Sequence, residues 1–115
     1  MQAPGDDDVG RREYLRNATA AGADREALRF SAFCADRFMT HVRLAPGDKI
    51  LDVCTGTGAL ALAASQVVGP AGRVTAIDTA EGLLARLAAK IGKFGIANID
   101  VHNMDAAHLD FRRDY

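Results

Sequence analysis

The feature of this 115-residue chain that most constrains its fold is an alternation of short apolar runs with longer helical patterns. Apolar, mostly β-branched runs at 49–53, 73–77 and 99–102 predict three strands, and alanine- and leucine-rich stretches at 59–68 and 79–94 predict the helices between them. Strands that alternate with helices form a parallel sheet with right-handed crossovers and helices packed on its faces. The pattern therefore predicts the α/β class.

The same reading predicts where the folded part of the chain begins. Apolar side chains recur at three- and four-residue steps along residues 28–42, which indicates an amphipathic helix with Asp24 as its N-cap and Cys34 in the core. Residues 1–22 contain three consecutive aspartates and few large apolar groups, so we predict a flexible N-terminal arm. Residues 23–115 are predicted to form the folded domain.

Two expectations concern the first predicted strand, residues 49–53. Its nearly continuous apolar run is typical of a strand that is covered on both faces of a parallel sheet. If the strands pair in the order third, second, first, this strand is an unpaired apolar edge, which proteins ordinarily avoid. Either the chain is a fragment of a longer protein, or another chain covers the edge, for example in a homodimer.

Composition argues against several classes of protein. The 14 basic and 15 acidic residues give a net charge of -1, so no general field attracts nucleic acid or anionic lipid. Two cysteines are too few for a disulfide scaffold, and no metal-ligand spacing, signal peptide or membrane-spanning run is recognisable. We expect a soluble cytoplasmic protein without a metal site, and the alanine, arginine and glycine content is typical of a GC-rich bacterial gene.

A glycine-containing loop joins the first predicted strand to the next helix. Its sequence is Asp52-Val53-Cys54-Thr55-Gly56-Thr57-Gly58. Glycines at the carboxyl end of a parallel strand let a ligand approach the backbone, and the amides that open the next helix point into the same crevice. Asp78 ends the second strand, where a carboxylate can accept hydrogen bonds from both hydroxyls of a ribose. Together these features indicate a cofactor that contains adenosine.

Nicotinamide dinucleotides leave the same pattern, because Gly56, Gly58 and Ala61 satisfy the relaxed dinucleotide fingerprint. Asp52 favours a different cofactor: a pyrophosphate would meet added negative charge there, whereas a cationic sulfonium and amino group would not. Asp105, after the third strand, could accept a hydrogen bond from an adenine amino group. Three aspartates after three successive strands suit a positively charged adenosine ligand.

Residues 50–111 resemble the class I S-adenosylmethionine-dependent methyltransferases, especially the group that contains the quinone-ring C-methyltransferases. The glycine loop is similar to the first motif of that family, residues 74–78 to the second, and residues 105–111 to the segment that holds adenine. Two positions depart from the commonest pattern: Cys54 replaces a glycine, and Asp110 stands where the family often has proline.

The resemblance implies an S-adenosyl-L-methionine cofactor, a Rossmann-like parallel sheet truncated after about three strands, and methyl transfer to an acceptor, for which a small molecule is expected. It implies Asp78 as the ribose ligand, Asp105 at the exocyclic amine of adenine and the Ala106 backbone at the ring. The expected cofactor-binding residues are Asp52, Thr55, Gly56, Gly58, Asp78, Thr79, Asp105 and Ala106. No catalytic residue is assigned, because in this family those groups usually come from the fourth strand onward.

Two alternatives stay open at this point. The first is the half-domain of an NAD(P)-dependent oxidoreductase, and the second is a non-catalytic module that dimerises through its first strand. Single residues also have a purely structural interpretation: Gly56 and Gly58 can serve a tight turn, and Asp78 can cap a helix that starts near Thr79.

Overall fold

The computed structural model describes residues 25–112 and 115, with side chains from residue 32 onward. Six elements follow one another along the chain: α2 (Arg25–Met39), β1 (Lys49–Val53), α3 (Ala59–Val68), β2 (Arg73–Asp78), α4 (Glu81–Phe94) and β3 (Ile99–Asn103). Strands and helices alternate as the sequence predicts, and the α/β class is confirmed. The arm predicted for residues 1–22 lies outside the described residues.

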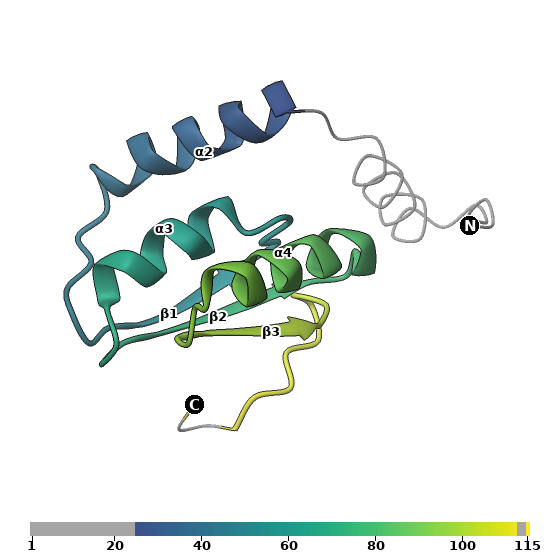
Figure 1. Ribbon diagram of the computed structural model, residues 1–115. Coiled ribbons are helices and arrows are strands. Elements are labelled where there is room, and N and C mark those ends of the chain that lie inside the picture. The colour runs from purple at the N-terminus through teal and green to yellow at the C-terminus, as the bar shows by residue number, and fades with distance from the viewer. Residues whose placement is uncertain (1–24, 113–114) are drawn as a thin grey trace.

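The three strands form one parallel sheet in the order β1-β2-β3. Lys49 at the start of β1 pairs with Arg73, and Val74 on β2 pairs with Ile99 at the start of β3. Because all three strands point the same way, their carboxyl ends meet at one edge of the sheet (Figure 1). In the described part of the chain, β1 is the outer strand on one side, as the sequence suggests.

All three labelled helices lie on one side of the sheet. Figure 1 shows α3 and α4 over the same face, and α2 packs against α3 as a third layer. On β1, Leu51 is 43% and Val53 is 42% exposed, so the expectation that this strand is covered on both faces is wrong for the described structure. The physical reason is that both crossovers move across the sheet in the same direction, and connections of one hand then place their helices on one face.

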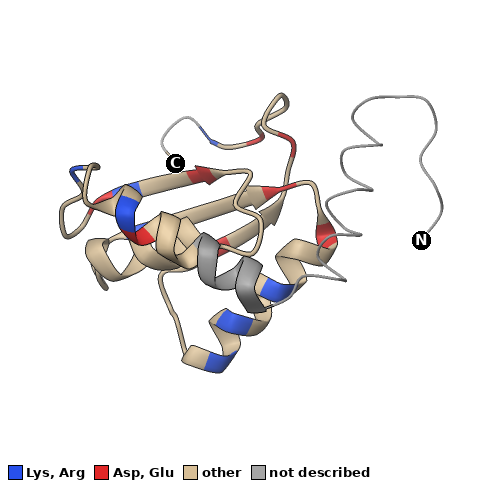
Figure 2. Ribbon diagram, turned by 90° about the horizontal axis from the view of Figure 1, so that it is seen from above, with Lys and Arg blue, Asp and Glu red and all other residues tan. Residues whose placement is uncertain are grey.

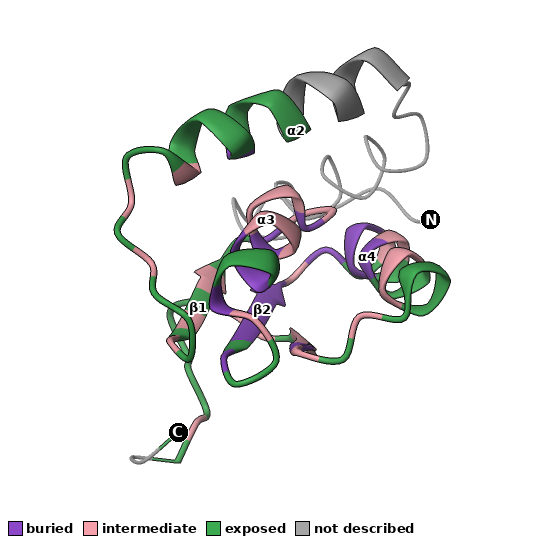
Figure 3. Cartoon of the chain, turned by 60° about the vertical axis from the view of Figure 1, so that its left-hand side comes forward, coloured by how far each residue is buried: buried purple, intermediate pink, exposed green. Residues whose placement is uncertain are grey.

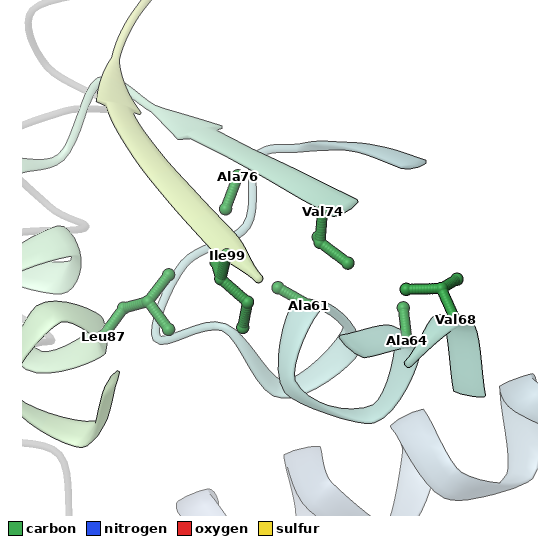
Figure 4. Packing of buried hydrophobic residues seen from close by; sticks show 7 residues of the cluster. All are labelled: Ala61, Ala64, Val68, Val74, Ala76, Leu87 and Ile99. Carbon is green, nitrogen blue, oxygen red and sulfur yellow. The ribbon is translucent and has the colours of Figure 1, made fainter. Parts of the chain in front are cut away.

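The core fills the space between this face and the helices. Figure 4 shows Val74, Ala76 and Ile99 of the sheet directed toward residues of α3 and toward Leu87 of α4. The residues contributed by α3 are Ala61, Ala64 and Val68. Alanine at two of these positions lets the helix approach the sheet closely, as expected for close-packed interiors.

Helix α2 contributes less to the core than its pattern suggests. Ala35 is 4% exposed and Met39 packs against the core, but Phe33 and Phe38 are 63% and 52% exposed. Figure 3 shows the described turns of this helix as mostly exposed. The expectation that Cys34 lies in the core is wrong, since its side chain is exposed. The helix packs against α3 along a narrow stripe, and Cys34 falls outside it.

The opposite face of the sheet is partly covered by the C-terminal segment. The rings of Phe111 and Tyr115 stack with their centroids 4.8 Å apart, and the Thr75 hydroxyl lies 3.4 Å from the Tyr115 hydroxyl. His102 of β3 makes an edge contact with Phe111. A hollow of about 580 Å³ remains beside this segment, along Lys49 and Leu51 of β1.

Charges of both signs occur on several elements (Figure 2), in keeping with the net charge of -1. Within residues 25–112, no helix is both long and apolar enough to cross a membrane.

Candidate functional site

The loop between β1 and α3 turns tightly at the carboxyl end of β1. Three of its residues have positive φ: Cys54 at 58°, Gly56 at 61° and Gly58 at 85°. The Gly58 amide donates to the Thr55 carbonyl at 2.9 Å, and the Thr55 amide donates to the Ile77 carbonyl of β2 at 3.0 Å. The loop is thus a closed turn that is also joined to the neighbouring strand.

Position 58 requires a glycine both because a side chain would have no room there and because the backbone φ is positive. A Cβ atom at this position would lie 2.2 Å from Cδ1 of Leu87, whose side chain is fully buried in the core. Gly58 also stands at the N-cap of α3 without any side-chain cap. The absence of a side chain therefore allows α4 to pack directly against the glycine loop.

Asp78 joins the loop to the start of α4. Its side chain is 2% exposed, and its Oδ2 accepts a hydrogen bond from the Gly56 amide at 2.9 Å. Its Oδ1 accepts one from the Ala80 amide at 2.9 Å. The expected start of the helix at Thr79 is wrong by two residues, because Asp78 captures the Ala80 amide in a turn and α4 begins at Glu81. Asp78 therefore serves the helix end and the glycine loop together.

Asp52 lies half-buried next to the same loop. The Thr55 hydroxyl donates to its Oδ2 at 2.7 Å. Burial raises the pKa of Asp52; the Thr55 and Ala61 hydrogen bonds act in the opposite direction, and the charge of Asp78 adds to the rise. Two carboxylates are therefore close enough to repel one another at the carboxyl ends of adjacent strands.

The remaining predicted site residues lie at the same edge of the sheet. Thr79 is half-buried between β2 and α4. Asp105 follows β3, and its Oδ1 accepts from the Ala107 amide at 2.9 Å, which leaves Ala106 exposed in the intervening turn. The Met104 amide donates to the Asp78 carbonyl at 3.1 Å and holds this segment next to the end of β2.

The structure thus brings Asp52, Thr55, Gly56 and Asp78 into one hydrogen-bonded group. The backbone bond from Met104 to Asp78 places the next two residues, Asp105 and Ala106, beside that group.

One contact at the loop has no counterpart in the sequence analysis. The ammonium group of Lys90 on α4 donates to the Thr57 carbonyl at 3.0 Å. Lys90 lies three residues after the buried Leu87, at the border of the apolar face of α4, but a lysine at such a position is ordinarily solvated and the sequence gives no signal that it contacts the loop.

The described residues contain no group of three His, Cys, Asp or Glu side chains arranged to hold a metal ion.

Residues 50–115 match the protein family described as "Methyltransferase domain". The chain is 33% identical over 70 residues to a demethylmenaquinone methyltransferase of Listeria monocytogenes, covering 61% of this chain and 27% of that protein. It is 40% identical over 78 residues to a demethylmenaquinone methyltransferase of Staphylococcus aureus, covering 65% of this chain and 30% of that protein. The chain therefore spans less than a third of the length of these relatives.

Among solved structures, a SAM-dependent methyltransferase from Aquifex aeolicus is similar, with a TM-score of 0.64 and 28% identity. The match covers 77% of this chain and 47% of that one. The open parallel sheet with its helices therefore corresponds to the Rossmann-like part of such enzymes, as the sequence predicts.

Proposed function

Because the chain belongs to the methyltransferase domain family, we propose that it binds S-adenosyl-L-methionine and forms the cofactor-binding part of a methyltransferase. The observation that carries this proposal is the group in which Thr55 bonds to Asp52 and Gly56 bonds to Asp78, at the carboxyl ends of two adjacent parallel strands. Ligands of open α/β sheets bind outside this edge.

The charge of the group favours this cofactor over a nicotinamide dinucleotide. Burial is the main cause of the raised pKa of Asp52, and the charge of Asp78 adds to it, so a ligand that brings a sulfonium and an ammonium group would stabilise the two carboxylates. A pyrophosphate would add negative charge to the same place. The glycine loop has no side chain at Gly56 or Gly58, so the backbone can approach either ligand, and electrostatics makes the distinction.

The resemblance implies places for three residues around the cofactor: Asp78 would accept hydrogen bonds from the ribose hydroxyls, and Asp105 with the Ala106 backbone would hold adenine. The charge argument places Asp52 near the cationic amino group. Thr55 orients the Asp52 carboxylate, while Gly56 and Ala80 orient that of Asp78. When bound, the cofactor supplies an electrophilic methyl group on a cationic sulfur.

The test is isothermal titration of the purified chain with S-adenosylhomocysteine, followed by titration with NADH. We expect micromolar binding of the first ligand, at least about tenfold weaker binding after Asp78→Ala, and much weaker binding of NADH. Preference for NADH, or indifference to both ligands, would contradict the assignment.

Two further variants make this result interpretable. Asp100→Ala removes the same charge near the amino end of β3, where Asp100 pairs with Arg73, and it should bind like the wild type. Asp105→Asn changes a side chain that is 44% exposed, so it should fold normally even if Asp78→Ala does not. Weaker S-adenosylhomocysteine binding in Asp105→Asn alone would still support the site.

We propose a small molecule as the methyl acceptor. The names of the Listeria and Staphylococcus relatives support this class, since demethylmenaquinone is a small molecule. The described residues offer no candidate for the group that activates the acceptor, and we assign none.

Self-association through β1 is the second candidate property, and the exposure of Leu51 and Val53 on this outer strand favours it. Sedimentation of the wild type and of Leu51→Lys tests it. A dimer that dissociates in the variant supports pairing along β1, whereas a wild-type monomer at all concentrations excludes it.

A further inference from the structure

The Lys90 side chain extends from α4 and donates a hydrogen bond to the backbone of the glycine loop. It lies one turn after Leu87, so the two residues occupy the same side of the helix. Leu87 packs against Gly58, and the Lys90 ammonium donates to the carbonyl of the preceding residue, Thr57, at 3.0 Å. The helix therefore contacts two consecutive loop residues, one by packing and one by a hydrogen bond.

These contacts converge on a single peptide unit. The Thr57 carbonyl and the Gly58 amide belong to the same planar group. The carbonyl accepts from Lys90, and the amide donates to the Thr55 carbonyl at 2.9 Å. The peptide is thus held at both of its polar ends, and each bond polarises it in the direction that strengthens the other.

This peptide would otherwise have unusual rotational freedom. Gly58 has a φ of 85°, and glycine populates positive and negative φ about equally, so rotation of the Thr57–Gly58 peptide meets little steric resistance. A rotated peptide would reverse its dipole at the start of α3, next to the edge of the sheet where the cofactor would lie.

The placement of Lys90 argues against an incidental contact. Its side chain is partly buried, and burial together with the charge of Arg86 lowers its pKa. An ammonium group in such a position is unfavourable unless a hydrogen bond compensates it, and a bond from a charged donor to a carbonyl is among the stronger ones.

We propose that Lys90 is a positioning residue: it locks the orientation of the Thr57–Gly58 peptide and so presets the glycine loop for the cofactor. The effect on cofactor binding rests on the proposed function, whereas the fixed orientation of the peptide is a property of the ligand-free protein. Lys90 acts through the loop and is not a catalytic residue.

The test measures the orientation of the peptide and the binding of ligand separately. Hydrogen exchange of the Gly58 amide in the ligand-free protein reports on how firmly the peptide is held, and titration with S-adenosylhomocysteine reports on binding. In Lys90→Met, which keeps the length of the side chain without its donor, we expect Gly58 exchange to become about tenfold faster and binding about fivefold weaker. Lys90→Arg retains a charged donor and should restore most of both.

The matched control is Lys93→Met, which removes the same charge one turn later, where the ammonium lies over the Phe94 ring. Its Gly58 exchange and its binding should equal those of the wild type. The proposal is overturned if Lys90→Met leaves Gly58 exchange unchanged, or if Lys93→Met accelerates it equally. If Gly58 exchange accelerates only in Lys90→Met but the wild type binds no S-adenosylhomocysteine, the positioning of the peptide by Lys90 is supported and the proposed function is wrong.

Discussion

The Asp78 carboxylate accepts a hydrogen bond of 2.9 Å from the amide of Gly56, a residue that precedes it by 22 positions. The same carboxylate holds the Ala80 amide at the start of α4. Since Asp78 is 2% exposed, water cannot readily replace it as the acceptor for either amide. The contribution of Asp78 to stability can therefore be measured in the ligand-free protein, separately from any contribution to binding.

Asp78→Asn replaces one acceptor oxygen by an amino group that faces a backbone N–H. We expect the free energy of unfolding to fall by about 1–3 kcal/mol, because one buried amide loses its acceptor. Urea denaturation followed by circular dichroism at pH 7 measures this. Asp100→Asn, at the exposed ion pair with Arg73, should change stability far less. Equal stability of the two variants would contradict the role given to Asp78.

Gly58→Ala should destabilise the fold by about 2 kcal/mol, through strain at positive φ and through the clash with Leu87. The control lies on α4 itself. A Cβ at Gly92 would meet nothing within 4 Å, so Gly92→Ala should raise stability by about 0.5–1 kcal/mol. Thermal or urea unfolding of both variants checks the opposite signs, and a stable Gly58→Ala protein would show that α4 does not pack closely on the loop.

Asp52 should make stability depend on pH in an unusual direction. Burial raises its pKa above the ordinary 3.8, so the folded state binds the proton more tightly than the unfolded state. The resulting stabilisation is present below pH 3.8 and is lost as the pH rises through the folded-state pKa. Asp52→Asn, which can still accept from Thr55, should therefore be more stable than the wild type at pH 7.

Urea denaturation at several pH values tests this prediction, and the stability difference between Asp52→Asn and the wild type should shrink toward acidic pH. The same variant should bind S-adenosylhomocysteine more weakly, because the carboxylate that faces the amino group is lost. A variant that is less stable at pH 7, with the difference growing at higher pH, would show that the Asp52 charge stabilises the fold.

The two exposed thiols provide a test of the site without any substitution. Cys54 belongs to the glycine loop, whereas Cys34 lies on α2 and is not among the predicted site residues. Alkylation by iodoacetamide, read by peptide mass spectrometry, should be slowed about tenfold at Cys54 when S-adenosylhomocysteine is present at ten times its Kd. Cys34 should react at an unchanged rate. Equal protection of both thiols, or of neither, would place the ligand elsewhere.

The strands could be predicted because local patterns determine them, whereas their order in the sheet is only a conditional expectation tied to the resemblance. The β-branched runs and the glycine-proline stop after Val68 fixed β1 and the end of α3 without any knowledge of tertiary contacts. The face on which the helices lie could not be read in this way. The apolar run in β1 suggests cover on both faces, and only the direction of the crossovers shows that Leu51 and Val53 remain exposed.

The candidate site likewise combines features that could be predicted from the sequence with features that could not. That Asp52, Gly56 and Asp78 lie close together could be predicted, because the two aspartates are at the ends of adjacent strands and Gly56 is in the loop after the first. Lys90 could not, since its role depends on the packing of α4 against the loop, and lysine on an amphipathic helix is ordinarily solvated. The positive φ of Cys54 is not apparent from the cysteine itself, although the glycine that the family commonly has at this position is consistent with it.

The sequential strand order has a consequence for how the protein is made. Each strand pairs with the next one along the chain, so the sheet can grow by successive addition during synthesis, and each addition closes the loop of one helical crossover. The glycine loop, however, is synthesised well before the carboxylate that holds its Gly56 amide. The Gly56 amide therefore gains its acceptor only after α3 and β2 have been synthesised, although the glycine motif itself is made earlier.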